Sequence, residues 1–224
     1  HLMDHPSNSL TFETEEPLWA GRGPMSPASI NSLRDGDFRK DYASFRIDIA
    51  NSSQVQSVTQ DLLAEGVYGI SLDNEIRRRA SHQTILKNVM EQLPNYDNRI
   101  ILSDKKDKLG IPKPAAIYHM DDYVHRGMAR AVKEYTEIAR LMGGTNLRFS
   151  KPGVYGNNQH ITGTMSMGHD PKDSVVDAFG RTHDHENLFI TSTGVMPTSA
   201  TVNSTLTAVA LALRTADHLA KTAL

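Results

Sequence analysis

The stretch ASFRIDIA, residues 43–50, alternates three apolar side chains with the charged side chains of Arg46 and Asp48. Successive side chains of a strand point to opposite faces of a sheet. An alternation with a period of two therefore predicts a strand that is buried on one face and solvated on the other. Strands of this kind are typical of antiparallel sheets.

The segments around this strand predict a mixture of strands and helices. Residues 121–142 carry the clearest helical pattern, an apolar face that ends before two glycines. Further helices are predicted at 55–65, 75–93 and 205–220, further strands at 68–72, 99–103, 115–119, 147–150 and 188–192, and mostly loop at 7–40. Several strands precede any regular alternation with crossover helices. This order favours an α+β fold for residues 40–150, an antiparallel sheet backed by helices 75–93 and 121–142.

The composition excludes several classes of protein. The 224 residues include 24 basic and 26 acidic side chains, and 38% are apolar. A net charge of −2 gives no electrostatic drive towards nucleic acid or anionic lipid, and no apolar run is long enough to cross a membrane, so no nucleic-acid partner and no integral membrane segment are expected. The absence of cysteine excludes disulfides, thiol catalysis and cysteine-held metals. The first residues, HLMDHP, resemble neither a signal peptide nor a start, so we interpret the chain as a fragment.

The candidate chemistry lies in the last seventy residues. His160 stands in a glycine-rich polar segment, 153–168, where backbone can approach a ligand closely. A lone histidine is more often structural than functional. His1 and His5 are discounted as metal ligands, as His183 and His185 are below. Asn203 either caps the last helix or belongs to an anion site at the N-terminus of that helix.

The pair His183 and His185 could be interpreted as the metal site of a hydrolase. Histidines two residues apart in a strand point to opposite sides and share an ion poorly, so a solvated loop is the better interpretation. We therefore predict no metal site.

Residues 160–219 resemble the C-terminal signature of the glucose–methanol–choline (GMC) flavin oxidoreductases. The matching residues are, in order, His160, Gly163-Thr164, Met167-Gly168, SVVD at 174–177, Arg181, Asn187-Leu188-Phe189, Met196-Pro197-Thr198, Asn203 and 210–217. Residues 2–6 and 93–112 also resemble family segments. Within the family, residues 159–177 and the asparagine at position 203 are most similar to the flavoprotein subunits of bacterial gluconate 2-dehydrogenase, fructose dehydrogenase and sorbitol dehydrogenase.

The resemblance implies FAD as cofactor and oxidation of a CH–OH group of a sugar, sugar acid or polyol. It implies His160 as the base and Asn203 as its partner, with the cofactor contacted by Ser192, Thr193, Gly194, Met196 and Thr205. It divides the chain into a remnant of the FAD domain (1–6), a substrate domain (7–150) and a C-terminal segment that returns to an FAD-binding α/β domain (151–224).

The same resemblance implies a periplasmic protein that assembles with a small subunit and a cytochrome c subunit. Two departures from the family pattern stand out: the chain has no GxGxxG nucleotide-binding motif, and Ser192 replaces an aspartate common in the family. Without the nucleotide-binding half, the alternative is an isolated substrate-binding or assembly fragment that retains no FAD. Leu206, Val209 and Leu213 of the last helix would then be exposed or covered by another copy.

Overall fold

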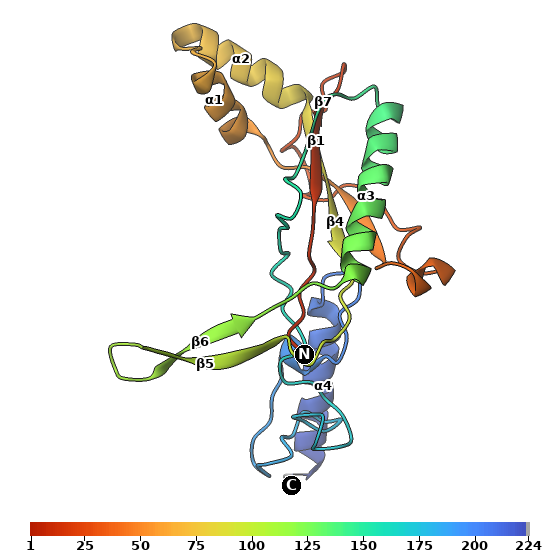
Figure 1. Ribbon diagram of the computed structural model, residues 1–224, viewed down its shortest axis with the longest axis vertical. Coiled ribbons are helices and arrows are strands. Elements are labelled where there is room, and N and C mark those ends of the chain that lie inside the picture. Colours follow the sequence, from red (N-terminus) through yellow and green to blue (C-terminus); the bar gives the residue numbers. More distant parts are fainter. Residues whose placement is uncertain (223–224) are drawn as a thin grey trace. The chain divides into compact units, whose positions relative to one another are not determined.

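The computed structural model describes residues 1–222, and Figure 1 labels most of their helices and strands. The chain divides into two compact units. The first, which we call the site unit, consists of residues 1–6, 90–124 and the segment from 157 onward. The second, the sheet unit, consists of residues 7–89 and 125–156.

A five-stranded sheet forms the centre of the sheet unit. Its strand order is β2 (Ser29–Ile30), β3 (Phe45–Ala50), β4 (Gln83–Met90), β1 (Ser9–Glu13), β7 (Thr145–Phe149). β1 pairs antiparallel with β4, where Leu10 is opposite Leu86, and antiparallel with β7, and β2 pairs antiparallel with β3. The predicted α+β fold with an antiparallel sheet is confirmed, and β3 is the strand expected from ASFRIDIA.

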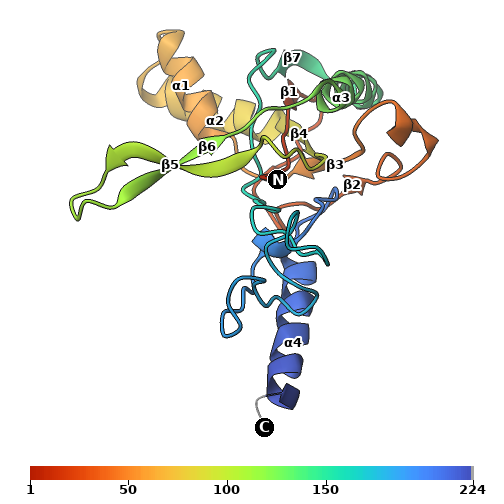
Figure 2. The same ribbon diagram turned by 60° about the horizontal axis from the view of Figure 1, so that its bottom comes forward.

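Helix α3 (Asp122–Leu141) packs along this sheet, as Figures 1 and 2 show. Its buried Tyr135 donates its hydroxyl to the carbonyl of Asn8 at 3.1 Å. Gly144, just after the helix, touches the sheet so closely that a Cβ there would lie 2.7 Å from the ring of Phe12. The two glycines predicted to end this helix therefore also let the chain turn back against the core.

Helices α1 (Val55–Ala64) and α2 (Gly69–His82) lie side by side, which Figures 1 and 2 both show. They share a small apolar core made by Val58, Leu62 and Ala80. The helix expected at 55–65 is confirmed, whereas the strand expected at 68–72 is wrong because α2 begins there.

The helix expected at 75–93 is also wrong, because α2 ends at His82 and β4 follows directly. Ile85 and Val89 are four residues apart, a spacing that fits a helix as well as a strand. β4 lies inside the sheet and is buried along most of its length, so it lacks the alternation that identifies a half-solvated strand. β1 was missed within 7–40 because only Leu10 and Phe12 carry its apolar pattern.

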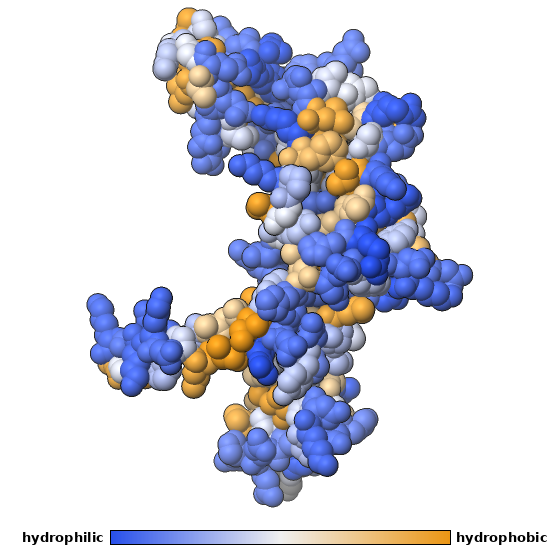
Figure 3. Space-filling view, in the orientation of Figure 1, coloured by the Kyte–Doolittle hydropathy of each residue, from blue (hydrophilic) through white to orange (hydrophobic). Residues whose placement is uncertain are grey.

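The site unit holds a hairpin of β5 (Arg99–Lys106) and β6 (Pro112–Ile117), the short 3₁₀ turn η2 (Thr193–Val195) and helix α4 (Thr205–Thr222). The strands expected at 99–103 and 115–119 are found in this hairpin, whose apolar side chains are exposed in Figure 3. The strand expected at 188–192 is wrong: only one bridge forms there, between Arg181 and Phe189, because no neighbouring strand supplies a continuous set of hydrogen bonds.

Helix α4 confirms the helix expected at 205–220 and exposes the apolar residues named from the sequence. Leu206 is 82% exposed, Val209 51% and Leu213 66%. Among residues 1–222, no helix has both the length and the apolar character needed to cross a membrane.

Candidate active site

The N-terminal segment and the glycine-rich segment are joined by a short antiparallel bridge inside the site unit. The amide of Met3 donates to the carbonyl of Thr162 at 3.0 Å, and the amide of Thr162 donates to the carbonyl of Met3 at 2.9 Å. Gly163 makes this approach possible: its φ is +83°, and a Cβ there would lie 2.1 Å from the carbonyl oxygen of His1. This bridge brings His5 and His160 together.

One carboxylate fixes the backbone of both histidines. Oδ1 of Asp4 accepts the amide of His5 at 2.6 Å and the amide of His160 at 2.9 Å. The side chain of Asn158 adds a third tie, since its Nδ2 donates to the carbonyl of His5 at 2.8 Å. The two imidazoles are thus mounted on backbone that is held at several points.

The side chains of His5, His160 and Asn203 form a hydrogen-bonded row. Nδ1 of His5 lies 2.8 Å from Nδ1 of His160, with the rings edge to face and their centroids 5.0 Å apart. On the other side of the His160 ring, Nε2 lies 3.1 Å from Nδ2 of Asn203. His5 is buried, His160 is partly buried and Asn203 is exposed, so the row runs from the interior to the surface.

Asn203 therefore contacts His160, which distinguishes it from a residue that only caps α4. The helix begins two residues later, at Thr205. Its first backbone N–H groups have no acceptor within the helix and face the end at which Asn203 stands. Asn203 thus lies beside both the histidine and the start of the helix.

The other residues expected from the resemblance lie on the turn η2 and at the start of α4. The hydroxyl of Thr193 donates to the carbonyl of Ile161 at 2.7 Å, next to His160 in the chain. Gly194 is buried against the same segment, since its carbonyl accepts the amide of Met165 and a Cβ there would lie 2.6 Å from the methyl group of that side chain. Met196 is buried at the end of the turn, whereas Ser192 and Thr205 are exposed.

A network of polar side chains holds the backbone of Asp4 in place. Oε1 of Gln92 accepts both the amide of Asp4 at 3.1 Å and the hydroxyl of Tyr118 at 2.7 Å. Ser199 bonds to the backbone of Gln92 through its hydroxyl, which accepts from the amide and donates to the carbonyl. Burial, and secondly the charge of Asp4, raise the pKa of Tyr118 to about 12, so its hydroxyl stays a donor at neutral pH.

Sequence reasoning did not name Asp4 and His5 as candidate site residues. The available signal was the resemblance of residues 2–6 to a family segment, but a single histidine near a chain end carries no pattern that indicates a distant partner. Nε2 of His183 lies 2.9 Å from the hydroxyl oxygen of Ser174. Within the part of the chain that is described, no three His, Cys, Asp or Glu side chains form a group suited to a metal ion.

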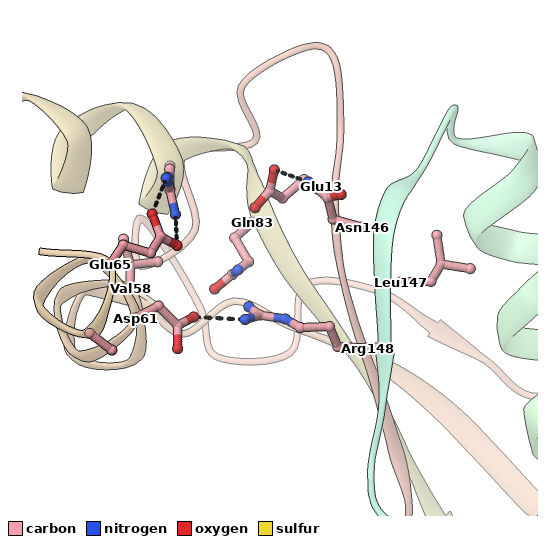
Figure 4. A pocket seen from close by; sticks show the side chains of 10 residues that line it. Glu13, Val58, Asp61, Glu65, Gln83, Asn146, Leu147 and Arg148 are labelled. Atoms are coloured by element: carbon pink, nitrogen blue, oxygen red, sulfur yellow. Dashed lines mark hydrogen bonds and ion pairs between the residues drawn. The ribbon is translucent and has the colours of Figure 1, made fainter. Parts of the chain in front are cut away.

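A pocket of about 500 Å³ lies within the sheet unit, and none of the predicted site residues line it. Figure 4 shows that its charged side chains pair with one another across the pocket. Arg79 binds Glu65 through two bonds of 2.8 and 2.7 Å, and Arg148 binds Asp61 at 2.7 Å. These pairs connect helices α1 and α2 with each other and with β7.

Comparison with known proteins places the chain in a family. Residues 94–212 match the family described as GMC oxidoreductase. The chain belongs to the GMC oxidoreductase family. The resemblance seen in residues 160–219 is therefore confirmed. His160 and Asn203 both lie within the matched residues.

Solved structures share the GMC fold. Pyridoxine 4-oxidase from Mesorbium loti is similar with a TM-score of 0.65 at 18% identity, covering 97% of this chain and 42% of that one. Formate oxidase from Aspergillus oryzae RIB40 is similar with a TM-score of 0.66 at 12% identity, covering 99% of this chain and 47% of that one.

Curated GMC-related sequences are also similar. The large subunit of fructose dehydrogenase from Gluconobacter japonicus is 45% identical over 220 residues, which is 98% of this chain and 40% of that protein. Paromamine 6'-oxidase from Streptomyces fradiae is 33% identical over 135 residues, 60% of this chain and 25% of that protein. The chain thus spans less than half the length of these relatives.

Proposed function

We propose that this chain is the C-terminal part of an FAD-dependent flavoprotein that oxidises a CH–OH group of a sugar, sugar acid or polyol. The observation that carries the proposal is the 3.1 Å contact between Nε2 of His160 and the side-chain amide of Asn203. Relatives support the substrate class, since a fructose dehydrogenase, a paromamine 6'-oxidase and a pyranose 2-oxidase are among them.

His160 accepts the proton of the substrate hydroxyl at Nε2. A free imidazole has a pKa near 6.5, so its neutral form is available at neutral pH. Asn203 does not titrate, and its amide group orients the substrate oxygen by a hydrogen bond beside Nε2. The hydroxyl proton goes to His160 while the carbon loses a hydride, so the substrate becomes a carbonyl compound.

The residues of the site unit fit one edge of a flavin. FAD, when bound, supplies the two-electron acceptor for the hydride from the substrate carbon. The first backbone N–H groups of α4 and the exposed hydroxyls of Ser192 and Thr205 are donors suited to the polar edge of the flavin ring. The turn η2 is held beside the His160 segment by the hydroxyl of Thr193 and by the carbonyl of Gly194, and Met196 follows it directly. The chain has no GxGxxG motif, so the pyrophosphate would be held by residues outside it.

The proposal extends to assembly and location. The relative from Gluconobacter japonicus is named a large subunit, which supports assembly with further subunits, and we expect a small subunit and a cytochrome c subunit. We also propose a periplasmic location, on the family resemblance alone.

The second candidate is a substrate-binding or assembly fragment without activity. The exposed apolar face of α4, with Leu206, Val209 and Leu213, supports it for the chain taken alone. Purification of the 224-residue chain tests the second candidate: flavin absorbance that survives gel filtration would contradict an inactive fragment that retains no FAD.

The test of the proposed base is His160→Ala in the full-length flavoprotein. We expect kcat to fall about 10²–10⁴-fold, the usual contribution of a positioned base. Flavin content should stay the same, because Nε2 points to Asn203. The ring nitrogens of His160 bond to His5 and Asn203, and its backbone amide bonds to Asp4. Full activity in this variant would contradict the proposal.

A further inference from the structure

The hydrogen bond between His5 and His160 has a direction that can be deduced. It joins two ring nitrogens of the same kind, Nδ1 to Nδ1, at 2.8 Å. Such a bond forms only when one nitrogen carries a hydrogen and the other offers a lone pair. Two neutral imidazoles therefore have to adopt opposite tautomers across this contact.

Asn203 decides which ring is the donor. Its Nδ2 is an amide nitrogen that donates and does not accept, and it lies 3.1 Å from Nε2 of His160. Nε2 of His160 therefore accepts, and the single hydrogen of this neutral ring is at Nδ1. It follows that His160 donates through Nδ1 and that Nδ1 of His5 accepts.

We propose that His5 is a positioning residue that keeps the proton of His160 at Nδ1 and so keeps Nε2 unprotonated, as the acceptor to which the substrate hydroxyl can pass its proton. The catalytic role of His5 rests on the proposed function, whereas the tautomers of the two rings follow from the hydrogen-bond geometry. Without an acceptor at Nδ1, the ring of His160 is free to carry its hydrogen at Nε2, and in that form it cannot take a proton there.

The surroundings of His5 suit this role. Its side chain is 1% exposed, so water competes weakly for the shared bond. Asp4 ties the backbones of both histidines to one oxygen, and Asn158 holds the carbonyl of His5. Rotation of either ring away from the other would break a buried hydrogen bond.

The arrangement also serves the protonated state. When His160 takes the substrate proton at Nε2, it carries hydrogens on both nitrogens, and Nδ1 still donates to His5. The bond remains in place throughout, no proton passes to His5, and the imidazolium keeps its partner. His5 thus orients the base in the way that a buried carboxylate orients the histidine of a catalytic triad.

Two substitutions in the full-length flavoprotein separate this role from packing. His5→Phe keeps a flat ring but removes the acceptor, and we expect kcat to fall about 10- to 100-fold while KM stays nearly constant. His5→Gln places an amide oxygen near Nδ1 of His160, and we expect it to recover most of kcat. His183→Ala is the matched control: its ring is also hydrogen-bonded within the site unit, but to Ser174.

Solid-state ¹⁵N NMR on protein with labelled histidine, at a pH where the rings are neutral, reads the tautomer without any need for activity. We expect a hydrogen on Nδ1 of His160 in the native protein and in His5→Gln, and its move to Nε2 in His5→Phe. His160→Gln assigns the signal.

Three results would overturn the inference: a native His160 protonated at Nε2, a tautomer that His5→Phe leaves unchanged, or equal loss of kcat in His5→Phe and His5→Gln. The native tautomer decides even if the phenylalanine variant does not fold. Full activity of His160→Ala would instead overturn the proposed function and leave the tautomer result standing.

Discussion

The side chain of Asp4 accepts the backbone amide of His160 at 2.9 Å, although 156 residues separate the two in the sequence. The same oxygen accepts the amide of His5 at 2.6 Å. A carboxylate that is bound twice through one oxygen fixes the spacing of the two histidines, because neither backbone segment moves without losing a charge-assisted bond. The position of the proposed base is thus set from its main chain as well as from its ring.

Asp4→Ala tests this relationship. We expect a loss of about 2–4 kcal/mol of unfolding free energy, because two buried amides lose a charged acceptor. Urea denaturation monitored by circular dichroism measures the loss. Asp4→Asn is the control, since its amide oxygen can still accept both bonds and should retain most of the stability. Equal losses in the two variants would contradict the role of the shared oxygen.

Gly163→Ala tests the bridge between the N-terminal and glycine-rich segments. We expect a loss of about 3 kcal/mol or more, because alanine meets both an unfavourable φ of +83° and the carbonyl of His1 at 2.1 Å. Gly153→Ala is matched for backbone strain, with a φ of +75° and no atom within 4 Å, and should lose only about 1 kcal/mol. The difference between the two midpoints of urea unfolding isolates the cost of the close contact.

Asn203→Ala in the full-length flavoprotein tests the orienting amide. We expect kcat to fall while the acid limb of its pH profile remains, because the titrating group, His160, is still present. Asn203→His keeps a ring N–H that can donate and should retain more activity. Steady-state kinetics across pH 5–9 provide the measurement. Loss of the acid limb in Asn203→Ala would contradict the assignment of that limb to His160.

The raised pKa of Tyr118 predicts how stability depends on alkaline pH. The folded protein holds the phenol proton up to a pKa of about 12, above the ordinary value of 10.0, so the native state binds more protons in this interval. The contribution is fully present below pH 10 and is lost as pH rises towards 12.

Tyr118→Phe removes this contribution, so its unfolding free energy should fall less steeply over the same interval. Burial also raises the pKa of Tyr135, which stays in both proteins and cancels in the comparison. Denaturation at pH 9, 10 and 11 measures the two slopes. Parallel slopes would show that Tyr118 titrates in the folded state as it does in the unfolded chain.

In the sheet unit, the sequence predicts the elements that have one solvated face better than β4, which is mostly buried. Strand β3 and helix α3 each have one solvated face, so their apolar residues recur in the sequence with periods of 2 and 3.6. β4 is buried on most of its length and β1 carries only two apolar positions, and both were missed. Burial on both faces removes the alternation that would reveal β4 in the sequence.

The candidate site shows a different limit. His160 and Asn203 could be named because they stand in an ordered series of family motifs. The partnership of His5 with His160 depends on the bridge between Met3 and Thr162, a pairing of distant segments. Nothing in the local sequence around His5 indicates which histidine it meets, so this contact required the fold.

The row His5–His160–Asn203 has a consequence for biosynthesis, because the ribosome adds its three residues at widely separated times. At about 5–20 residues per second, the ribosome needs roughly 10–40 seconds to pass from the first to the last of them. The nascent chain therefore carries an incomplete row until α4 is being made. Any cofactor or chaperone that engages the emerging protein earlier meets the first histidine without its partner, and assembly of the site is among the last steps of folding rather than the first.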